Sequence, residues 1–224
     1  MLERAREDPP RGGRILFHRA AAGAGGMPGG HRMDGTEKSL LRARVRSAVR
    51  ALTAGERAAL SQQACAALRA EPVWQSARRV LFYAPLGDEV DIGPLLDEAW
   101  AGGRAVALLR FETAIQSYTP CAVASRAALV SGPFGVLEPG PDCPAMPLNP
   151  LDLVFVPGVA FDLCGRRLGR GKGYYDRVLA AVSGHKCGVA FDAQLVATVP
   201  EEPHDVRVNS ILTPVGWRTC APAD

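Results

Sequence analysis

The segment 152–179 constrains the fold more than any other part of the sequence, because it joins an apolar run, a basic glycine-rich loop and a helical pattern. Residues 152–156 read DLVFV, which is typical of a strand buried on both faces of a parallel sheet, and Pro157 and Gly158 end the run. Residues 174–181 continue as an amphipathic helix, whose first N–H groups lack partners within the helix and attract anions. This order predicts an α/β fold with a phosphate site in the loop.

The loop alternates cationic side chains with glycines. They are Arg166, Arg167, Arg170 and Lys172 beside Gly165, Gly169, Gly171 and Gly173. Glycine lets the backbone turn freely and approach a ligand closely, so both charge and backbone N–H groups are available to a phosphate. The pattern matches neither a Walker loop nor the GxGxxG of a dinucleotide-binding fold. A basic surface turn is the alternative interpretation, and four bases in seven residues between a buried strand and a helix favour the phosphate site.

Length and charge limit the classes of protein to consider. At 224 residues the chain fits one α/β domain, which we expect at residues 34–224. Its formal net charge is +3, but residues 1–33 hold six of the 26 Lys and Arg and three of the 23 Asp and Glu, which leaves 20 of each sign in the remainder. A neutral domain gives no general reason to expect a nucleic-acid or membrane partner, so the basic loop is a local feature.

Residues 1–33 differ in composition from the rest of the chain. They mix Arg, Pro and Gly, include AAAGAGGMPGG and show no sustained period, which predicts a disordered N-terminal extension. A start of translation at Met27 or Met33 explains the same composition equally well. The three acidic residues of this segment argue against a transit peptide.

Six cysteines lie far apart in sequence, at positions 65, 121, 143, 164, 187 and 220, and form no CxxC pair. They indicate neither a zinc ribbon nor a redox motif, so reduced thiols are the expected state. No apolar run approaches the roughly 20 residues that a membrane span needs, and the first residues lack the apolar core of a secretory signal. We expect a cytoplasmic protein that acts as a monomer.

A first helix is predicted after Asp34, which with Glu37 three residues later forms a capping pattern. Its apolar face carries Leu41, Val45, Ala48, Val49 and Leu52. Lys38 and Arg42, four residues apart, project together from one side of this helix. Without other information, such a pair is most often part of a solvated helix face.

Helical and strand patterns alternate along the rest of the chain. Helices are predicted from the capping pair Thr53 and Glu56 to Leu68, and again at 92–101. Strands are predicted at 79–84, 104–109 and 186–191, and after a loop that holds Asp205. This alternation predicts a mainly parallel sheet covered on both faces, with the ligand beyond the carboxyl ends of the strands.

Two runs within the segment 152–179 are specific to one family. PGVAFD at 157–162 and RLGRGKGYYDR at 167–177 closely resemble the signature of 5-formyltetrahydrofolate cyclo-ligases, also called methenyltetrahydrofolate synthetases. The resemblance covers roughly residues 36–214 and implies a three-layer α/β/α sandwich with a mainly parallel sheet. It also implies ATP- and Mg²⁺-dependent conversion of 5-formyltetrahydrofolate to 5,10-methenyltetrahydrofolate, with release of ADP and phosphate after phosphorylation of the formyl oxygen.

The resemblance assigns roles to residues along the chain. It implies that Lys172 and Arg170 are catalytic. ATP would be bound by Lys38, Arg42, Arg167, Leu168, Gly169, Arg170, Gly171, Lys172, Gly173, Tyr174 and Tyr175. The folate would contact Glu89, Arg170, Gly171, Lys172, Gly173 and Tyr174, and Mg²⁺ would be held by Asp176 and Asp205.

Several assignments stay open at this point. Residues 111–120 depart from the family pattern, so Tyr118 is the best candidate there for an aromatic folate contact, with a structural role equally compatible. Glu138, in SGPFGVLEP, is either a site residue or a local hydrogen-bond anchor. A non-catalytic nucleotide- or phosphate-binding module is the alternative function. A relative of sugar-phosphate isomerases or CoA-transferases would rest on fold analogy alone.

Overall fold

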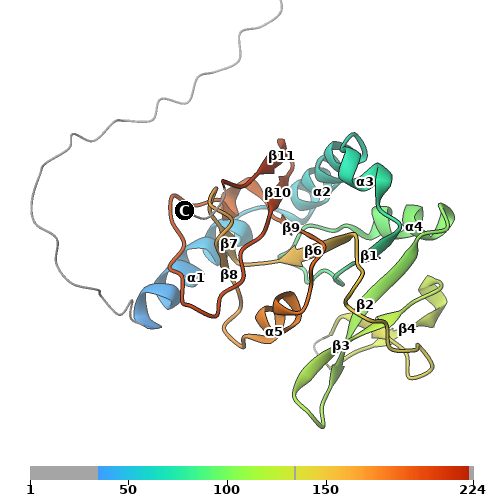
Figure 1. Ribbon diagram of the computed structural model, residues 1–224. Helices are drawn as coiled ribbons and strands as arrows, with labels where there is room; N and C mark the ends of the chain where they lie inside the picture. Colours follow the sequence, from blue (N-terminus) through green and yellow to red (C-terminus); the bar gives the residue numbers. More distant parts are fainter. Residues whose placement is uncertain (1–34, 134, 222–224) are drawn as a thin grey trace, which may run out of the picture. The chain divides into compact units, whose positions relative to one another are not determined.

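In the computed structural model, which describes residues 35–133 and 135–221, seven strands form one sheet whose central strands are parallel (Figure 1). The strands are β1 (Arg79–Leu81), β2 (Ala105–Glu112), β3 (Ser117–Ala122), β6 (Leu153–Pro157), β9 (His185–Val189), β10 (Ser210–Thr213) and β11 (Gly216–Thr219). Their order is β11-β10-β9-β6-β1-β2-β3. β10, β9, β6, β1 and β2 run parallel, and β11 and β3 pair antiparallel at the two edges. The predicted extension at 1–33 and the predicted cap at Asp34 lie outside the described residues.

Helices cover both faces of this sheet, because alternate residues of each buried strand point to opposite sides. On one face, α2 (Ala54–Arg69), α3 (Pro72–Ser76) and α4 (Gly93–Ala101) pack against Phe82 and Phe155. On the other, α5 (Tyr174–Ala180) packs against Leu81 and Val154 (Figure 1). The predicted three-layer α/β/α sandwich with a mainly parallel sheet is therefore confirmed.

The first helix, α1 (Gly35–Arg50), packs mainly against a small hairpin, and only its buried Val49 joins the core cluster of the main sheet. Its buried Leu41 and Val45 lie in one cluster with Ala160 of β7 (Ala160–Phe161) and Leu168 of β8 (Arg167–Leu168). Ala48, predicted on the buried face, is exposed, because this narrow contact covers only part of the helix. This packing places the predicted cations Lys38 and Arg42 of α1 beside the glycine-rich loop that follows β8.

The sequence patterns miss several elements. The β7–β8 hairpin separates β6 from the basic loop, where the sequence predicted a direct connection. β1 ends at Leu81 rather than at residue 84, and β2 extends to Glu112 because it forms a hairpin with β3. The remaining pieces are a two-stranded sheet of β4 (Leu129–Ser131) and β5 (Leu137–Pro139), and the 3₁₀ turns η1 (Arg126–Ala128) and η2 (Asp192–Gln194). None of the described helices is both long and apolar enough to cross a membrane.

A buried aspartate fixes the turn of the β7–β8 hairpin. Asp162 is 1% exposed, and its Oδ1 accepts the N–H groups of Cys164 and Arg166 at 3.0 and 3.1 Å. Its Oδ2 accepts the N–H of Val199 at 2.9 Å, which ties the turn to a later segment. Within the turn, Gly165 has φ +79°, and a Cβ there would collide with the carbonyl oxygen of Val208. The turn therefore tolerates only glycine at this position.

The turn can be tested by comparing Gly165→Ala with Gly103→Ala, which has a similar φ of +69° but open space around its Cβ position. The left-handed backbone should cost both variants about 1–2 kcal/mol. Gly165→Ala should lose about 1–3 kcal/mol more in free energy of unfolding, because Val208 must move. Urea unfolding measures both. Equal destabilisation would contradict the proposed clash.

Candidate active site

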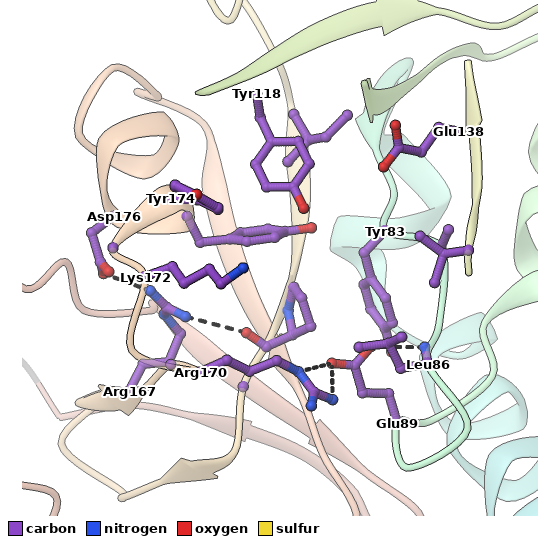
Figure 2. A pocket seen from close by; sticks show the side chains of 18 of the residues that line it. Tyr83, Leu86, Glu89, Tyr118, Glu138, Arg167, Arg170, Lys172, Tyr174 and Asp176 are labelled. Carbon is purple, nitrogen blue, oxygen red and sulfur yellow. Dashed lines mark hydrogen bonds and ion pairs between the residues drawn. The ribbon is translucent and has the colours of Figure 1, made fainter. Parts of the chain in front are cut away.

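A pocket of about 360 Å³ opens beyond the carboxyl ends of β1 and β6, where the sequence predicted a ligand site (Figure 2). Tyr83 and Glu89 line it from the segment after β1, Tyr118 from β3, and Glu138 from β5. The glycine-rich loop 169–173 and the start of α5 complete the wall. The pocket thus joins cations, carboxylates and aromatic rings from segments that lie far apart in sequence.

Arg42 supports the glycine-rich loop from outside the pocket. Its Nε donates a hydrogen bond to the carbonyl oxygen of Gly169 at 2.9 Å. Gly171 has φ +97°, and a Cβ there would lie 3.6 Å from the guanidinium of Arg42, so the loop passes close over this side chain. The helix predicted at 174–181 is found as α5, Tyr174–Ala180, and it begins directly after the loop. Arg42 and the start of α5 thus lie on either side of the glycine-rich loop.

Lys38 and Asp205 meet across 167 residues of sequence. The Nζ of Lys38 lies 2.8 Å from Oδ2 of Asp205 and 3.1 Å from Oε2 of Glu202. Burial acts to lower the pKa of Lys38, but the hydrogen bonds to the two carboxylates outweigh it and raise the pKa above its ordinary value. The structure thus brings a predicted ATP-binding cation and a predicted metal ligand into one ion pair.

Arg170 connects the loop to the segment after β1. Its Nη2 lies 2.6 Å from Oδ1 of Asp88 and 2.9 Å from Oε1 of Glu89. Oε2 of Glu89 accepts the N–H of Leu86 at 3.0 Å. Burial raises the pKa of Glu89 above its ordinary value, against the lowering effect of Leu86 and Arg170. The predicted catalytic arginine and the predicted folate contact are therefore in direct contact (Figure 2).

Arg167 is buried beneath the loop rather than presented to solvent. It is 6% exposed, and its Nη2 lies 2.5 Å from Oδ1 of Asp176. Its Nη1 reaches the carbonyl oxygen of Pro157 at 3.4 Å, and its guanidinium lies 5.9 Å from the ring centroid of Tyr175. Leu168 is 2% exposed, with its side chain in the core cluster beneath α1. Arg167 therefore lies in the pocket wall, paired with Asp176, and the side chain of Leu168 packs away from the pocket beneath α1.

Aromatic rings form one side of the pocket (Figure 2). The ring of Tyr174 lies 5.4 Å from Phe111 and 5.7 Å from Tyr118 between centroids. The Nζ of Lys172 lies 5.7 Å from the centroid of Tyr174. Tyr175 also lines the pocket, and burial raises the pKa of its hydroxyl. Tyr118 was the aromatic candidate of the divergent segment, and it lies in the pocket.

Sequence reasoning missed some residues of the site. Tyr83 lines the pocket and donates its hydroxyl to the carbonyl oxygen of Val90 at 2.6 Å, but it read as part of a buried strand. Asp88 binds Arg170, and only its position beside Glu89 could have indicated it. Gln194, by contrast, was not missed, since the resemblance placed a Gln there. It is buried and donates to the carbonyl oxygen of Gly158, a residue of the pocket wall, at 2.7 Å.

The two predicted metal ligands lie in different surroundings. Among the residues that the structure describes, three potential ligands gather at Glu202, His204 and Asp205, with ligand atoms within 4.8 Å of one another. Asp176 does not belong to this group and uses Oδ1 for Arg167. Oδ2 of Asp176 lies outside its pair with Arg167, and Oδ1 of Asp205 lies outside its pair with Lys38, at 3.8 Å from Nε2 of His204.

Comparison with known proteins agrees with this geometry. A sequence profile of the 5-formyltetrahydrofolate cyclo-ligase family matches residues 34–214. A 5-formyltetrahydrofolate cyclo-ligase of Escherichia coli K12 is 32% identical over 180 residues, which cover 76% of this chain and 96% of the relative. One from Mycolicibacterium smegmatis is 38% identical over 151 residues, or 62% of this chain and 75% of the relative.

A solved structure shares both the fold and the sequence. The 5,10-methenyltetrahydrofolate synthetase of Aquifex aeolicus superposes with a TM-score of 0.75 at 35% identity, covering 84% of this chain and 94% of that one. The chain therefore belongs to the 5-formyltetrahydrofolate cyclo-ligase family.

Proposed function

We propose that this protein converts 5-formyltetrahydrofolate to 5,10-methenyltetrahydrofolate, with ATP converted to ADP and phosphate. The observation that carries the proposal is the pocket itself, in which Lys172 and Arg170 of the glycine-rich loop face an aromatic wall that includes Tyr118 and Tyr174. The cations suit the phosphates of ATP, and the aromatic rings suit a pteridine. Both substrates would then meet at the loop.

The chemistry explains why one site needs both features. The oxygen of the N5-formyl group is a poor leaving group, and its attack on the γ-phosphate of ATP turns it into a phosphate ester, with release of ADP. The N10 amine then attacks the activated carbon and loses its proton, and the carbon–oxygen bond breaks to release phosphate. Phosphoryl transfer depends mainly on positioning and on neutralising charge on the transferred group.

The residues of the loop divide these tasks. Lys172 and Arg170, with the N–H groups of Gly169, Gly171 and Gly173, would neutralise the transferred phosphoryl group. Arg42 and Arg167 hold the loop in shape, since they bind the carbonyl of Gly169 and the carboxylate of Asp176. Lys38 would hold the rest of the triphosphate, and Leu168 would contribute through the backbone that leads into the loop.

Arg170 has to exchange partners during this reaction. Asp88 and Glu89 hold its guanidinium at 2.6 and 2.9 Å, and a γ-phosphate offers a stronger bidentate acceptor. Transfer of Arg170 to the phosphate would release the carboxylate of Glu89, which could then accept an N–H of the folate. ATP binding would in this way prepare the folate contact. Tyr174 would lie against the pteridine from the aromatic wall.

Mg²⁺ fits the donor chemistry of Asp176 and Asp205. Mg²⁺ binds one or two carboxylates together with phosphate oxygens and water, and each aspartate keeps an oxygen outside its ion pair. When bound, the ion would neutralise charge on the phosphates. Asp176 and Asp205 are therefore the residues we propose to hold it.

We further propose that the enzyme is a cytoplasmic monomer, in keeping with its six free cysteines.

The assay that tests the function uses purified protein with ATP, Mg²⁺ and 5-formyltetrahydrofolate. The expected result is methenyl product, followed by its absorbance, with ADP released only when the folate is present. A protein that binds nucleotide without folate-dependent hydrolysis would instead be a binding module.

Lys172→Ala should lower kcat by about 10²- to 10³-fold, since it removes one charge that stabilises the transferred phosphoryl group. Arg218→Ala, which removes an exposed cation on β11, is the control and should keep wild-type activity. Thermal unfolding of both variants should match the wild type. A near-normal rate of methenyl formation by Lys172→Ala would refute the catalytic assignment.

The pH profile should report Glu89. Because burial raises its pKa above the ordinary value of 4.5, the acid limb of kcat/KM should lie above pH 4.5, and Glu89→Gln should flatten that limb. Between the ordinary pKa of 4.5 and the raised pKa of the folded state, Glu89 binds more protons in the folded protein than in the unfolded chain. The contribution of Glu89 to stability therefore falls as the pH rises through this range. The stability of the wild type relative to Glu89→Gln should therefore decrease from pH 4.5 upward. A constant difference would contradict the assignment.

A further inference from the structure

A buried carboxylate with an unpaired oxygen lies in the wall of the active-site pocket. Glu138 is 4% exposed and lines the pocket from β5. Its Oε2 accepts the N–H of Phe111 at 3.0 Å, whereas its Oε1 has no hydrogen-bond partner among the described residues. A buried acceptor without a donor costs free energy, and a bound ligand that supplies a donor would recover it.

The chain keeps space for this carboxylate. A Cβ on Gly132 would lie 2.5 Å from the carboxyl carbon of Glu138, so no side chain fits at that position without moving Glu138. The negative charge also acts on a neighbour. Burial is the largest cause that raises the pKa of the Tyr118 hydroxyl on the aromatic wall, and the charge of Glu138 is the second. Glu138 is therefore close enough to the aromatic wall to act on a molecule that lies against it.

The pocket is electrically polarised. Figure 2 shows Glu138 on the side of the pocket away from Lys172, with Tyr118 between them. Arg170 and Lys172 supply positive charge at the loop. A ligand that fits this arrangement carries acceptors at one end and N–H donors at the other.

The reduced pteridine of the proposed substrate has this polarity. The oxygen of its N5-formyl group must face the phosphate and the cations of the loop. Its 2-amino group and N3–H, both donors, lie on the other ring and point away from N5. A carboxylate is the natural acceptor for two adjacent N–H groups, and such charge-assisted hydrogen bonds are the strong ones.

We propose that Glu138 recognises the pteridine by accepting hydrogen bonds from its 2-amino-pyrimidine edge. This inference rests on the proposed function and adds a residue that determines which folates the enzyme accepts. Oε2 stays with Phe111, and Oε1, which is buried beside Gly132, receives the N–H of the substrate when the carboxylate turns toward the pocket. Glu138 thus accepts one hydrogen bond from the backbone and a second one from the ligand.

Glu138→Gln separates the bond to Phe111 from the bond to the ligand, since glutamine carries only one acceptor oxygen. That oxygen can keep the bond from Phe111, and the amide nitrogen then presents N–H groups to the N–H groups of the substrate. The KM for 5-formyltetrahydrofolate should rise about 10- to 100-fold, while the KM for ATP stays at the wild-type value. Glu112→Gln, the same change on β2 outside the pocket, is the matched control and should leave both values unchanged.

A substrate analogue without the 2-amino group tests the same contact from the other side. The wild type should lose about 10- to 100-fold in kcat/KM with this analogue, and Glu138→Gln should lose little more than it has already lost. The analogue needs no variant, so it decides the matter even if Glu138→Gln fails to fold. Equal use of both substrates by the wild type would overturn the inference.

The outcomes distinguish this inference from the function beneath it. A wild-type protein that forms no methenyl product refutes the proposed function, and the inference with it. A wild type that turns over normally, beside a Glu138→Gln variant with unchanged KM for the folate, overturns the inference alone and leaves Glu138 as an anchor for Phe111.

Discussion

The ion pair between Arg167 and Asp176 is the interaction on which the active site depends. It joins the end of β8 to the first turn of α5 and so fixes both ends of the loop 169–173. The side chains are only 3% and 16% exposed, so removal of either partner would leave a charge stranded in a poorly solvated place. Because this pair holds the loop in place, Arg170 can exchange its partners for a ligand without a change in the loop.

Three other cations of the site are organised in the same way, and each is held by an acceptor of the protein. Lys38 is held by Asp205, Arg42 by a carbonyl and Arg170 by Asp88 and Glu89. Crowded like charges would otherwise repel one another in the absence of ligand. The phosphates of ATP would therefore enter a site in which Lys38 and Arg170 already hold carboxylates, and binding would include an exchange of partners.

The sequence predicted the layers of the fold because burial on both faces leaves a clear apolar pattern, as in residues 152–156. It did not predict the edge strands β3 and β11, whose half-exposed runs carry little periodicity, or the β7–β8 hairpin, whose buried strands are only two residues long each. Among site residues, the loop and Glu89 were found through a motif. The pairing of Lys38 with Asp205, and of Arg167 with Asp176, was not, because a contact across the fold leaves no trace in local spacing.

The contact between α1 and the segment near residue 205 also has a consequence for biosynthesis. A chain emerging from the ribosome completes Lys38 early and Asp205 only 167 residues later. Domains fold as units during or after synthesis, and this one cannot join α1 to the segment near residue 205 until almost all of its residues have been made. A nascent or truncated chain that lacks Asp205 therefore cannot form this ion pair, and its first helix lacks one of the contacts that tie it to the rest of the domain.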